Sequence, residues 1–358
     1  METMSVGELA ASQLGLPHYE EETPRETPIG LPILNLKNEH DSYEVYVIEE
    51  TEEAESLHQA ATMAGFYNSR FFHEYVQMNK ADVKVGEYRS AFRIEDSERN
   101  LSLFAVTRRD GFVLAELSTE HLANVAEQLA KLHAISVFDP NLEFCQTVME
   151  NYQVISEYRA EVLRSTLNEA RQLFQGEHKH FFQKPDWISG ELEQHSQWLS
   201  DRSTEDETGL GALVLCHGNL TAESLRFTQD GEHLVSIVDW ENVHFGDPAF
   251  DLSHLIITSA SPEIRRNHFM KVFRTYFYTL IDIRAQKFKL SDLKTSFRRF
   301  HREILLNGLR PLLDLLSSDV DDALKRSSAA RWEDCAEETA SFLSGQYISD
   351  EEQCFFAK

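Results

Sequence analysis

The stretch from Leu213 to Leu255 constrains the chain more than any other, because two apolar strand patterns within it end abruptly in polar residues. The first pattern, Leu213–Cys216, is followed by His217-Gly218-Asn219, and the second, Leu234–Val238, by Asp239-Trp240-Glu241. A strand fixes the backbone and the loop beyond it presents side chains, so this arrangement delivers imidazole, amide and acid groups to a cleft. An Asp-Gly turn signal between the two patterns predicts a hairpin that brings both polar clusters to one site.

The same stretch resembles the kinase-like family of small-molecule phosphotransferases. Its segments HGNLTAESLRF and VDWENVHFGDPAFDLSHL are similar in order and spacing to the family pattern HGDLWxxNxxF, then a strand ending in IDW(Q/E), then GxPxxDL. This family groups choline kinases and aminoglycoside kinases with ecdysteroid-kinase-like proteins, a branch also called CHK kinase-like. A second match is TEHLANVAEQLAKLHAIS, which resembles the family's long helix ending in LAxLHA.

The resemblance implies an α+β, two-lobed protein-kinase-like fold with a small antiparallel-sheet N-lobe, a large helical C-lobe and a cleft between them. The chain then divides into an extended or disordered arm, a kinase-like N-lobe, a helical C-lobe, and a C-terminal helical extension with an acidic tail, at residues 1–37, 38–117, 118–328 and 329–358. The arm has little periodicity and carries prolines among acids, a composition typical of disorder. Alternatively, it could wrap onto the first lobe through Leu31, Ile33 and Leu34.

The resemblance also assigns roles to residues at the matching positions. Asn219 stands where active members carry the aspartate that accepts the proton of the substrate hydroxyl, and Ser224 stands where an asparagine binds the second magnesium. His217 belongs to the same catalytic loop, Asp239 is a metal ligand, and Asp251 braces the loop that carries His217. An amide can orient a hydroxyl but cannot take its proton at neutral pH. The loss of a general base typically lowers the rate by about 10²–10⁴-fold.

The family's grip on ATP depends on a glycine-rich loop and a strand lysine, and the lysine is partnered by a helix glutamate that Glu74 matches here. No glycine occurs between Leu31 and Ala64, and backbone N–H groups need glycine to approach phosphates closely. The strand Tyr43–Ile48 has no lysine, and the two acids that follow it would repel a triphosphate. A lysine supplied from elsewhere, such as Lys37 or Lys84, is the alternative.

The composition of the chain limits which classes of binding partner and which cellular compartment we expect. The net charge of −26 over 358 residues argues against a nucleic-acid surface and against attraction to anionic membranes. Four cysteines without a CxxC pair, together with the lack of a basic-then-apolar leader, are typical of a cytoplasmic protein with free thiols. No apolar run is long enough to predict a membrane span.

Two functions remain open. The first is a degenerate kinase, or pseudokinase, that binds a protein partner or a small ligand. It rests on the loss of four features: the glycine-rich loop, the strand lysine, the base aspartate and the magnesium-binding asparagine. These losses affect nucleotide binding, metal binding and proton transfer. The alternative is a weak or active phosphotransferase that uses ATP and Mg²⁺ to phosphorylate a hydroxyl of a small lipophilic or choline-like molecule. It rests on the presence of Asp239, Asp251, His217 and Glu74.

Overall fold

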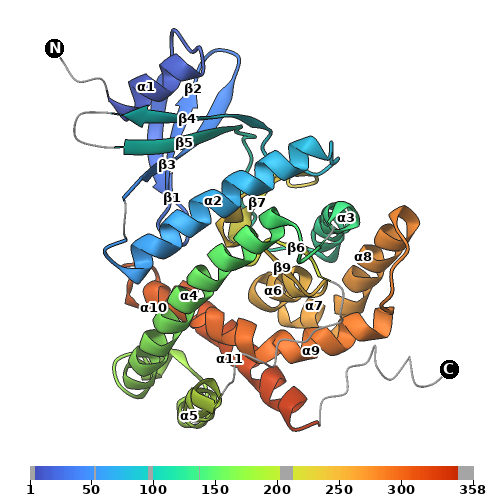
Figure 1. Cartoon of the computed structure of the whole chain (residues 1–358). Helices are drawn as coiled ribbons and strands as arrows, with labels where there is room; N and C mark the ends of the chain where they lie inside the picture. The colour runs from blue at the N-terminus through green and yellow to red at the C-terminus, as the bar shows by residue number, and fades with distance from the viewer. Residues whose placement is uncertain (1–4, 52–53, 96–99, 137, 202–212, 346–358) are drawn as a thin grey trace.

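The computed structural model describes residues 5–51, 54–95, 100–136, 138–201 and 213–345 and arranges them in two lobes (Figure 1). The elements of the N-terminal lobe are α1 (Val6–Gln13), β1 (Glu20–Glu26), β2 (Pro32–Lys37), β3 (Ser42–Glu49), α2 (Leu57–Met78), β4 (Tyr88–Glu95) and β5 (Asn100–Thr107). The strands form one antiparallel sheet of five strands in the order β1-β2-β3-β5-β4. The predicted antiparallel-sheet lobe is therefore confirmed.

The prediction that the chain begins with an extended or disordered arm is wrong for residues 6–37. These residues form α1 and the first two strands of the sheet, and β2 pairs with β3 from Ile33 opposite Tyr46 to Lys37 opposite Ser42. Leu31 and Ile33 are fully buried, as the alternative interpretation required. The segment is too polar to show a strand period by itself, and its order depends on pairing with the apolar strand β3.

The two faces of the sheet are covered by different helices. Alternate residues of β3 point to opposite faces, so Val45 packs with Ala10 and Ala11 of α1, whereas Tyr46 packs with Phe66 of α2. Helix α2 begins at the N-cap Ser56, whose side chain accepts a hydrogen bond from the Gln59 N–H. It crosses beneath the sheet in Figure 1, where it forms the boundary with the second lobe.

The second lobe is mainly helical. Its helices are α3 (Thr119–Ile135), α4 (Glu143–Gln175), α5 (Pro185–Asp201), α6 (Phe250–Ser259), α7 (Pro262–Asn267), α8 (Phe269–Ile283), α9 (Leu290–Asn307), α10 (Leu309–Ser317) and α11 (Asp322–Leu343). A single 3-10 turn at Lys179–Phe181 lies between α4 and α5. Between α5 and α6 lie the short strands β6 (Val214–Cys216), β7 (Leu225–Phe227), β8 (Leu234–Ile237) and β9 (His244–Gly246), with 3-10 turns at Ala222–Ser224 and Trp240–Asn242.

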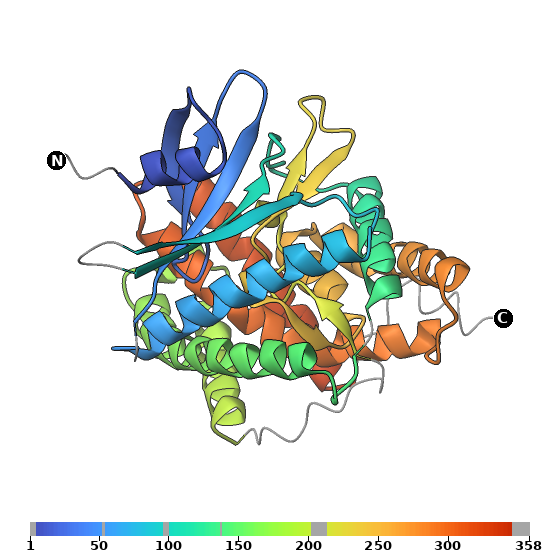
Figure 2. The ribbon, with the colours of Figure 1, turned by 45° about the horizontal axis from the view of Figure 1, so that its top comes forward.

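The lobes are joined by buried contacts as well as by the chain. Helices α2 and α4 run side by side (Figure 2), and Asn68 of α2 donates to the carbonyls of Val148 and Val243 at 3.2 and 2.9 Å. Phe72 of α2 stacks on Trp240 with ring centroids 3.7 Å apart. Helix α2 therefore fixes the N-terminal lobe directly against the loop that follows β8.

The C-terminal helix α11 is anchored in the core of the second lobe. Its N-terminus lies at Asp322, before the boundary expected at residue 329, and the acidic tail expected beyond it lies largely outside the described residues.

Cys145, Cys216 and Cys335 are buried free thiols, and Cys354 is also outside the described part. No helix in the described ranges is both long enough and apolar enough to cross a membrane.

Candidate functional site in the cleft between the lobes

The two polar clusters predicted to share a site do meet, but not through the predicted hairpin. Strand β6 pairs with β9, and β8 pairs with β7. The ends of β6 and β8 are joined instead by His217, whose Nε2–H donates to the Val238 carbonyl at 2.8 Å while Nδ1 accepts the Asn219 N–H at 3.2 Å. Burial lowers the pKa of His217 to about 4, so the ring is neutral at pH 7. With both nitrogens bonded to the backbone, His217 positions the loop and is not placed to transfer a proton.

Asp251 holds the same loop from below. Its two carboxylate oxygens accept the backbone N–H groups of His217 and Gly218 at 2.7 and 3.0 Å. Burial raises the pKa of Asp251 to about 6, against the lowering effect of these two hydrogen bonds. Gly218 has φ of +84°, and a Cβ there would lie 2.2 Å from the Asn242 carbonyl oxygen, so only glycine fits. The backbone that presents Asn219 is therefore rigidly held.

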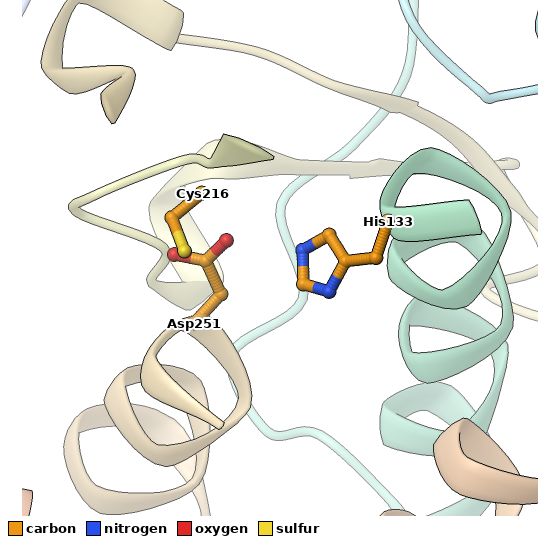
Figure 3. A group of neighbouring side chains, drawn as sticks. All are labelled: His133, Cys216 and Asp251. Atoms are coloured by element: carbon orange, nitrogen blue, oxygen red, sulfur yellow. The ribbon is translucent and has the colours of Figure 1, made fainter. Parts of the chain in front are cut away.

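Asp251 also belongs to a buried group with Cys216 of β6 and His133 of α3, which point toward one another in Figure 3. Their candidate ligand atoms lie within 4.8 Å of one another, and all three residue types can bind metal. A structural zinc site needs four ligands, whereas this group supplies three. The Asp251 oxygens already accept two N–H groups, and His133 Nδ1 is hydrogen-bonded to the Tyr276 hydroxyl at 2.7 Å. We interpret the group as packing beneath the loop.

Asp239, the predicted metal ligand, is held by an arginine that sequence reasoning missed. Its Oδ1 accepts a hydrogen bond from Arg25 of β1 at 2.6 Å, and the same guanidinium donates to Glu44 Oε1 of β3 at 2.9 Å. Although burial opposes the charge, Glu44 and Asp239 raise the pKa of Arg25, so it remains a permanent cation. Arg25 is the one Lys or Arg before Lys37 in the sequence, but no motif around it indicates a partner 214 positions away.

Two further predicted site residues, Ser224 and Glu74, lie at different places relative to Asp239. Ser224 is buried, and its carbonyl accepts the Val238 N–H at 2.9 Å, which places it beside the end of β8 and Asp239. Glu74 is not among the residues that line the cavity of this cleft; it accepts a hydrogen bond from Arg70 one turn earlier in α2 at 2.9 Å and keeps 32% of its side chain exposed. The α2 residue that reaches the cleft is instead His73.

The turn between β1 and β2 has one glycine, Gly30, at φ of +80°. Its N–H groups are used within the turn: Gly30 donates to the Thr27 carbonyl at 2.8 Å, and Leu31 donates to Thr27 Oγ1 at 3.2 Å. The Ile29 carbonyl accepts a hydrogen bond from Thr62 of α2 at 3.1 Å. The turn is therefore tied down onto α2, and these N–H groups are not open to a phosphate.

A cavity of about 330 Å³ lies where the sheet faces the β7–β8 hairpin. It is lined by residues of β3, α2, β5, the segment 108–112 that leads to the second lobe, β7 and β8. Neither Lys37 nor Lys84, the two lysines considered as substitutes, is among the lining residues, and neither is Asn219. A second cavity of about 520 Å³ lies beside α11 and is lined by none of the predicted site residues.

Comparison with known proteins agrees with this architecture. The sequence profile of the ecdysteroid kinase-like family matches residues 54–290. The chain belongs to the ecdysteroid kinase-like family. An ethanolamine kinase of Plasmodium vivax has a similar fold, with a TM-score of 0.52 and 12% identity over 95% of this chain and 88% of that one. The predicted family and the two-lobed kinase-like fold are thus confirmed.

Two curated proteins of Caenorhabditis elegans are also similar in sequence. The uncharacterized oxidoreductase dhs-27 is 24% identical over 213 residues, which are 54% of this chain and 24% of that protein. The uncharacterized kinase-like protein D1044.1 is 25% identical over 125 residues, 33% of this chain and 32% of that protein. The chain therefore spans only about a quarter and a third of the lengths of these two relatives.

Proposed function

We propose that this member of the ecdysteroid kinase-like family is catalytically degenerate and acts by binding a small ligand or a protein partner. The observation that carries the proposal is the ion pair between Arg25 and Asp239, at 2.6 Å. Magnesium binds carboxylate oxygens at about 2.0–2.1 Å, so the guanidinium and the metal ion compete for the same carboxylate. A permanent cation on the chain has the advantage in this competition, because it is already in place.

The charges around Asp239 also disfavour a triphosphate. Arg25, Glu44 and Asp239 together carry a net formal charge of −1, which leaves no excess positive charge for a triphosphate. Burial, with Asp239 nearby, raises the pKa of Glu241 well above its usual range. The side chain of β3 that pairs with Arg25 is an acid, whereas a nucleotide clamp needs a cation. With the N–H groups of Gly30 and Leu31 already bonded within the β1–β2 turn, the phosphates of ATP have few donors to replace their water.

Restoring the missing base tests whether catalysis fails at one residue or at several. Asn219→Asp supplies the carboxylate that deprotonates the substrate hydroxyl. It does not change the ion pairs of Arg25 with Asp239 and Glu44. We expect magnesium-dependent release of ADP from ATP to stay at background in wild type and in this variant. Asn219→Ala is the matched control. A rise of about 100-fold in Asn219→Asp, the scale of a general-base effect, would contradict the proposal.

The alternative is an ATP-dependent phosphotransferase, weak or active, for the hydroxyl of a small lipophilic or choline-like molecule. One observation favours it: Arg25 brings a cation into the cleft from β1, and such a cation could hold phosphates in place of the strand lysine. The braced loop at His217 and Asp251 is also compatible with catalysis. The two functions predict opposite effects on metal binding when Arg25 is removed.

A further inference from the structure

Two buried polar atoms in the lining of the 330 Å³ cavity have no hydrogen-bond partner within the described part of the chain. They are Nε2 of His73, on α2, and Oγ of Ser236, on β8. Both residues are almost fully buried, with 3% and 2% of their surface exposed. Buried polar atoms are nearly always hydrogen-bonded, so a pair of unpartnered ones in a single cavity indicates that something else supplies their partners.

The hydrogen bonds of His73 determine what that partner must offer. Its Nδ1 lies 2.9 Å from the Gly86 carbonyl oxygen, which can only accept, so Nδ1 carries the proton. Burial lowers the pKa of His73 to about 4, against the opposing effect of this hydrogen bond, and the ring is neutral at pH 7. Nε2 is therefore a bare acceptor that needs an N–H or O–H donor, while the Ser236 hydroxyl can give or accept a hydrogen bond.

The charged residues of the lining, in contrast, already have partners within the protein. These pairs are Glu44 with Arg25 at 2.9 Å, Arg108 with Asp110 at 2.9 Å, Arg109 with Glu87 at 3.2 Å, and Arg226 with the Glu223 carbonyl at 2.7 Å. The remaining walls include the apolar side chains of Val106, Ile237 and Val238 and the ring of Tyr46. The unpartnered groups that line the cavity are therefore neutral, whereas its charged side chains are already paired.

We propose that this cavity binds an uncharged small molecule with a ring skeleton that presents an N–H or O–H donor to His73. The inference rests on the proposed function, because it requires a cleft that a nucleotide does not occupy. The volume is at the lower end of the roughly 300–1,000 Å³ found for ligand pockets, so one or two fused rings fit it. The donor bonds to His73 Nε2, Ser236 supplies a second hydrogen bond, and the apolar walls cover the ring faces.

The test compares indole with N-methylindole, two uncharged probes of nearly the same shape of which only indole has an N–H. Binding to the full chain is followed by ligand-observed NMR and by calorimetry. We expect indole to bind about fivefold more tightly than N-methylindole, the scale of one neutral hydrogen bond. His73→Phe should reduce this ratio to about one. His73→Leu, which also removes the Nε2 acceptor, tests the same hydrogen bond if His73→Phe does not fold. Ser236→Ala is the control in the same pocket and should leave the ratio near fivefold, because neither probe has an acceptor for the Ser236 hydroxyl.

Three results would overturn the inference: no indole binding up to about 10 mM, a range that still detects very weak sites; equal binding of both probes; or a preference that neither His73 variant changes. A parallel titration with MgATP separates this inference from the proposed function. Nucleotide binding that displaces indole would refute the proposed function and leave the donor preference in place. Loss of the donor preference without nucleotide binding would refute this inference alone.

Discussion

At the scale of single residues, the cleft is organised by Arg25 and not by the residues of the recognisable motifs. Arg25 joins β1 to β3 and to the loop after β8 through Glu44 and Asp239, at 2.9 and 2.6 Å. Each of these acids would be a possible ligand for a divalent cation if the guanidinium were absent. The Arg25 side chain therefore determines whether these two acids are free to bind a metal ion or are paired with a cation of the protein itself.

Arg25→Met distinguishes the proposed function from its alternative. We expect the variant to bind Mn²⁺ measurably by calorimetry or relaxation enhancement, whereas wild type does not, because Glu44 and Asp239 are freed. The variant should also be less stable by roughly 1–3 kcal/mol, less than for a fully buried pair, because the Arg25 side chain is 26% exposed. Arg70→Met, which breaks the more exposed pair with Glu74, is the control. Metal binding by wild type with none in the variant would support the phosphotransferase.

The sequence predicted the motif residues but not their closest partners. His217, Asp239 and Asp251 could be located because they follow short apolar strands at a recognisable spacing. Arg25 and His73 could not, since their roles come from contacts that join distant parts of the chain: Arg25 lies 214 positions from Asp239. Glu74 was predicted from its place in the helix pattern, but the α2 residue that lines the cavity is its neighbour His73, while Glu74 pairs with Arg70.

At the scale of elements, the helical lobe is closed by α11, which packs on α7 through a buried ion network. Arg265 of α7 is fully buried and donates to Glu338 at 3.1 Å and to Asp334 at 2.8 Å. Burial raises the pKa of Glu338, and the two neighbouring arginines oppose that rise. An arginine cannot lose its proton when a partner is removed, so the network couples the two helices strongly.

Glu338→Ala should therefore lower the free energy of unfolding by about 3 kcal/mol, the scale for breaking a buried ion pair. The matched control on the same helix is Asp322→Ala, which removes an exposed pair with Arg326 at 3.5 Å. That change should cost about 0.5 kcal/mol or less. Urea denaturation of the two variants measures both values. An equal loss in the free energy of unfolding for the two substitutions would mean that the buried charge of Arg265 does not need Glu338 as a partner.

Among the elements, prediction succeeded where one segment carries its own pattern. The helix at Thr119–Ile135 begins at the N-cap Ser118 as the sequence indicated, and its apolar face is buried. A hairpin does turn at Asp230-Gly231, but its first strand is β7 and not the predicted Leu213–Cys216. Strand β6 pairs instead with β9. Strands β7 and β9 have three residues each and no readable period, so tertiary pairing alone defines them.

At the scale of the whole molecule, the number of buried neutral histidines makes stability depend on pH. Burial lowers the pKa of seven of them from 6.5 to about 3 or 4: His73, His133, His195, His217, His244, His254 and His301. Below pH 6.5 the unfolded chain takes up protons at these positions while the folded chain does not. Burial raises the pKa of Asp251 to about 6 and also raises that of Glu241, which opposes this effect in part.

We therefore expect the free energy of unfolding to fall as the pH is lowered from 7.5 through 6.5 to 5, with net proton uptake on unfolding. Each histidine contributes a slope of up to roughly 1.4 kcal/mol per pH unit, and the raised carboxyl groups subtract from the total. Chemical denaturation at several pH values gives the slope directly. Stability that is constant or rises over this range would show that the histidines are accessible to protons in the folded state.

The claim that the cleft no longer holds a nucleotide is tested most directly by a thermal-shift titration of the wild-type chain with ATP, with and without magnesium. A ligand at 100 times its Kd stabilises the folded state by roughly 2.7 kcal/mol, so binding in the micromolar range is readily detected at millimolar ATP. Because Arg25 is paired with Asp239, we expect no change in melting temperature under either condition. A saturable, magnesium-dependent rise would contradict it and would identify the chain as a nucleotide-binding member of the family.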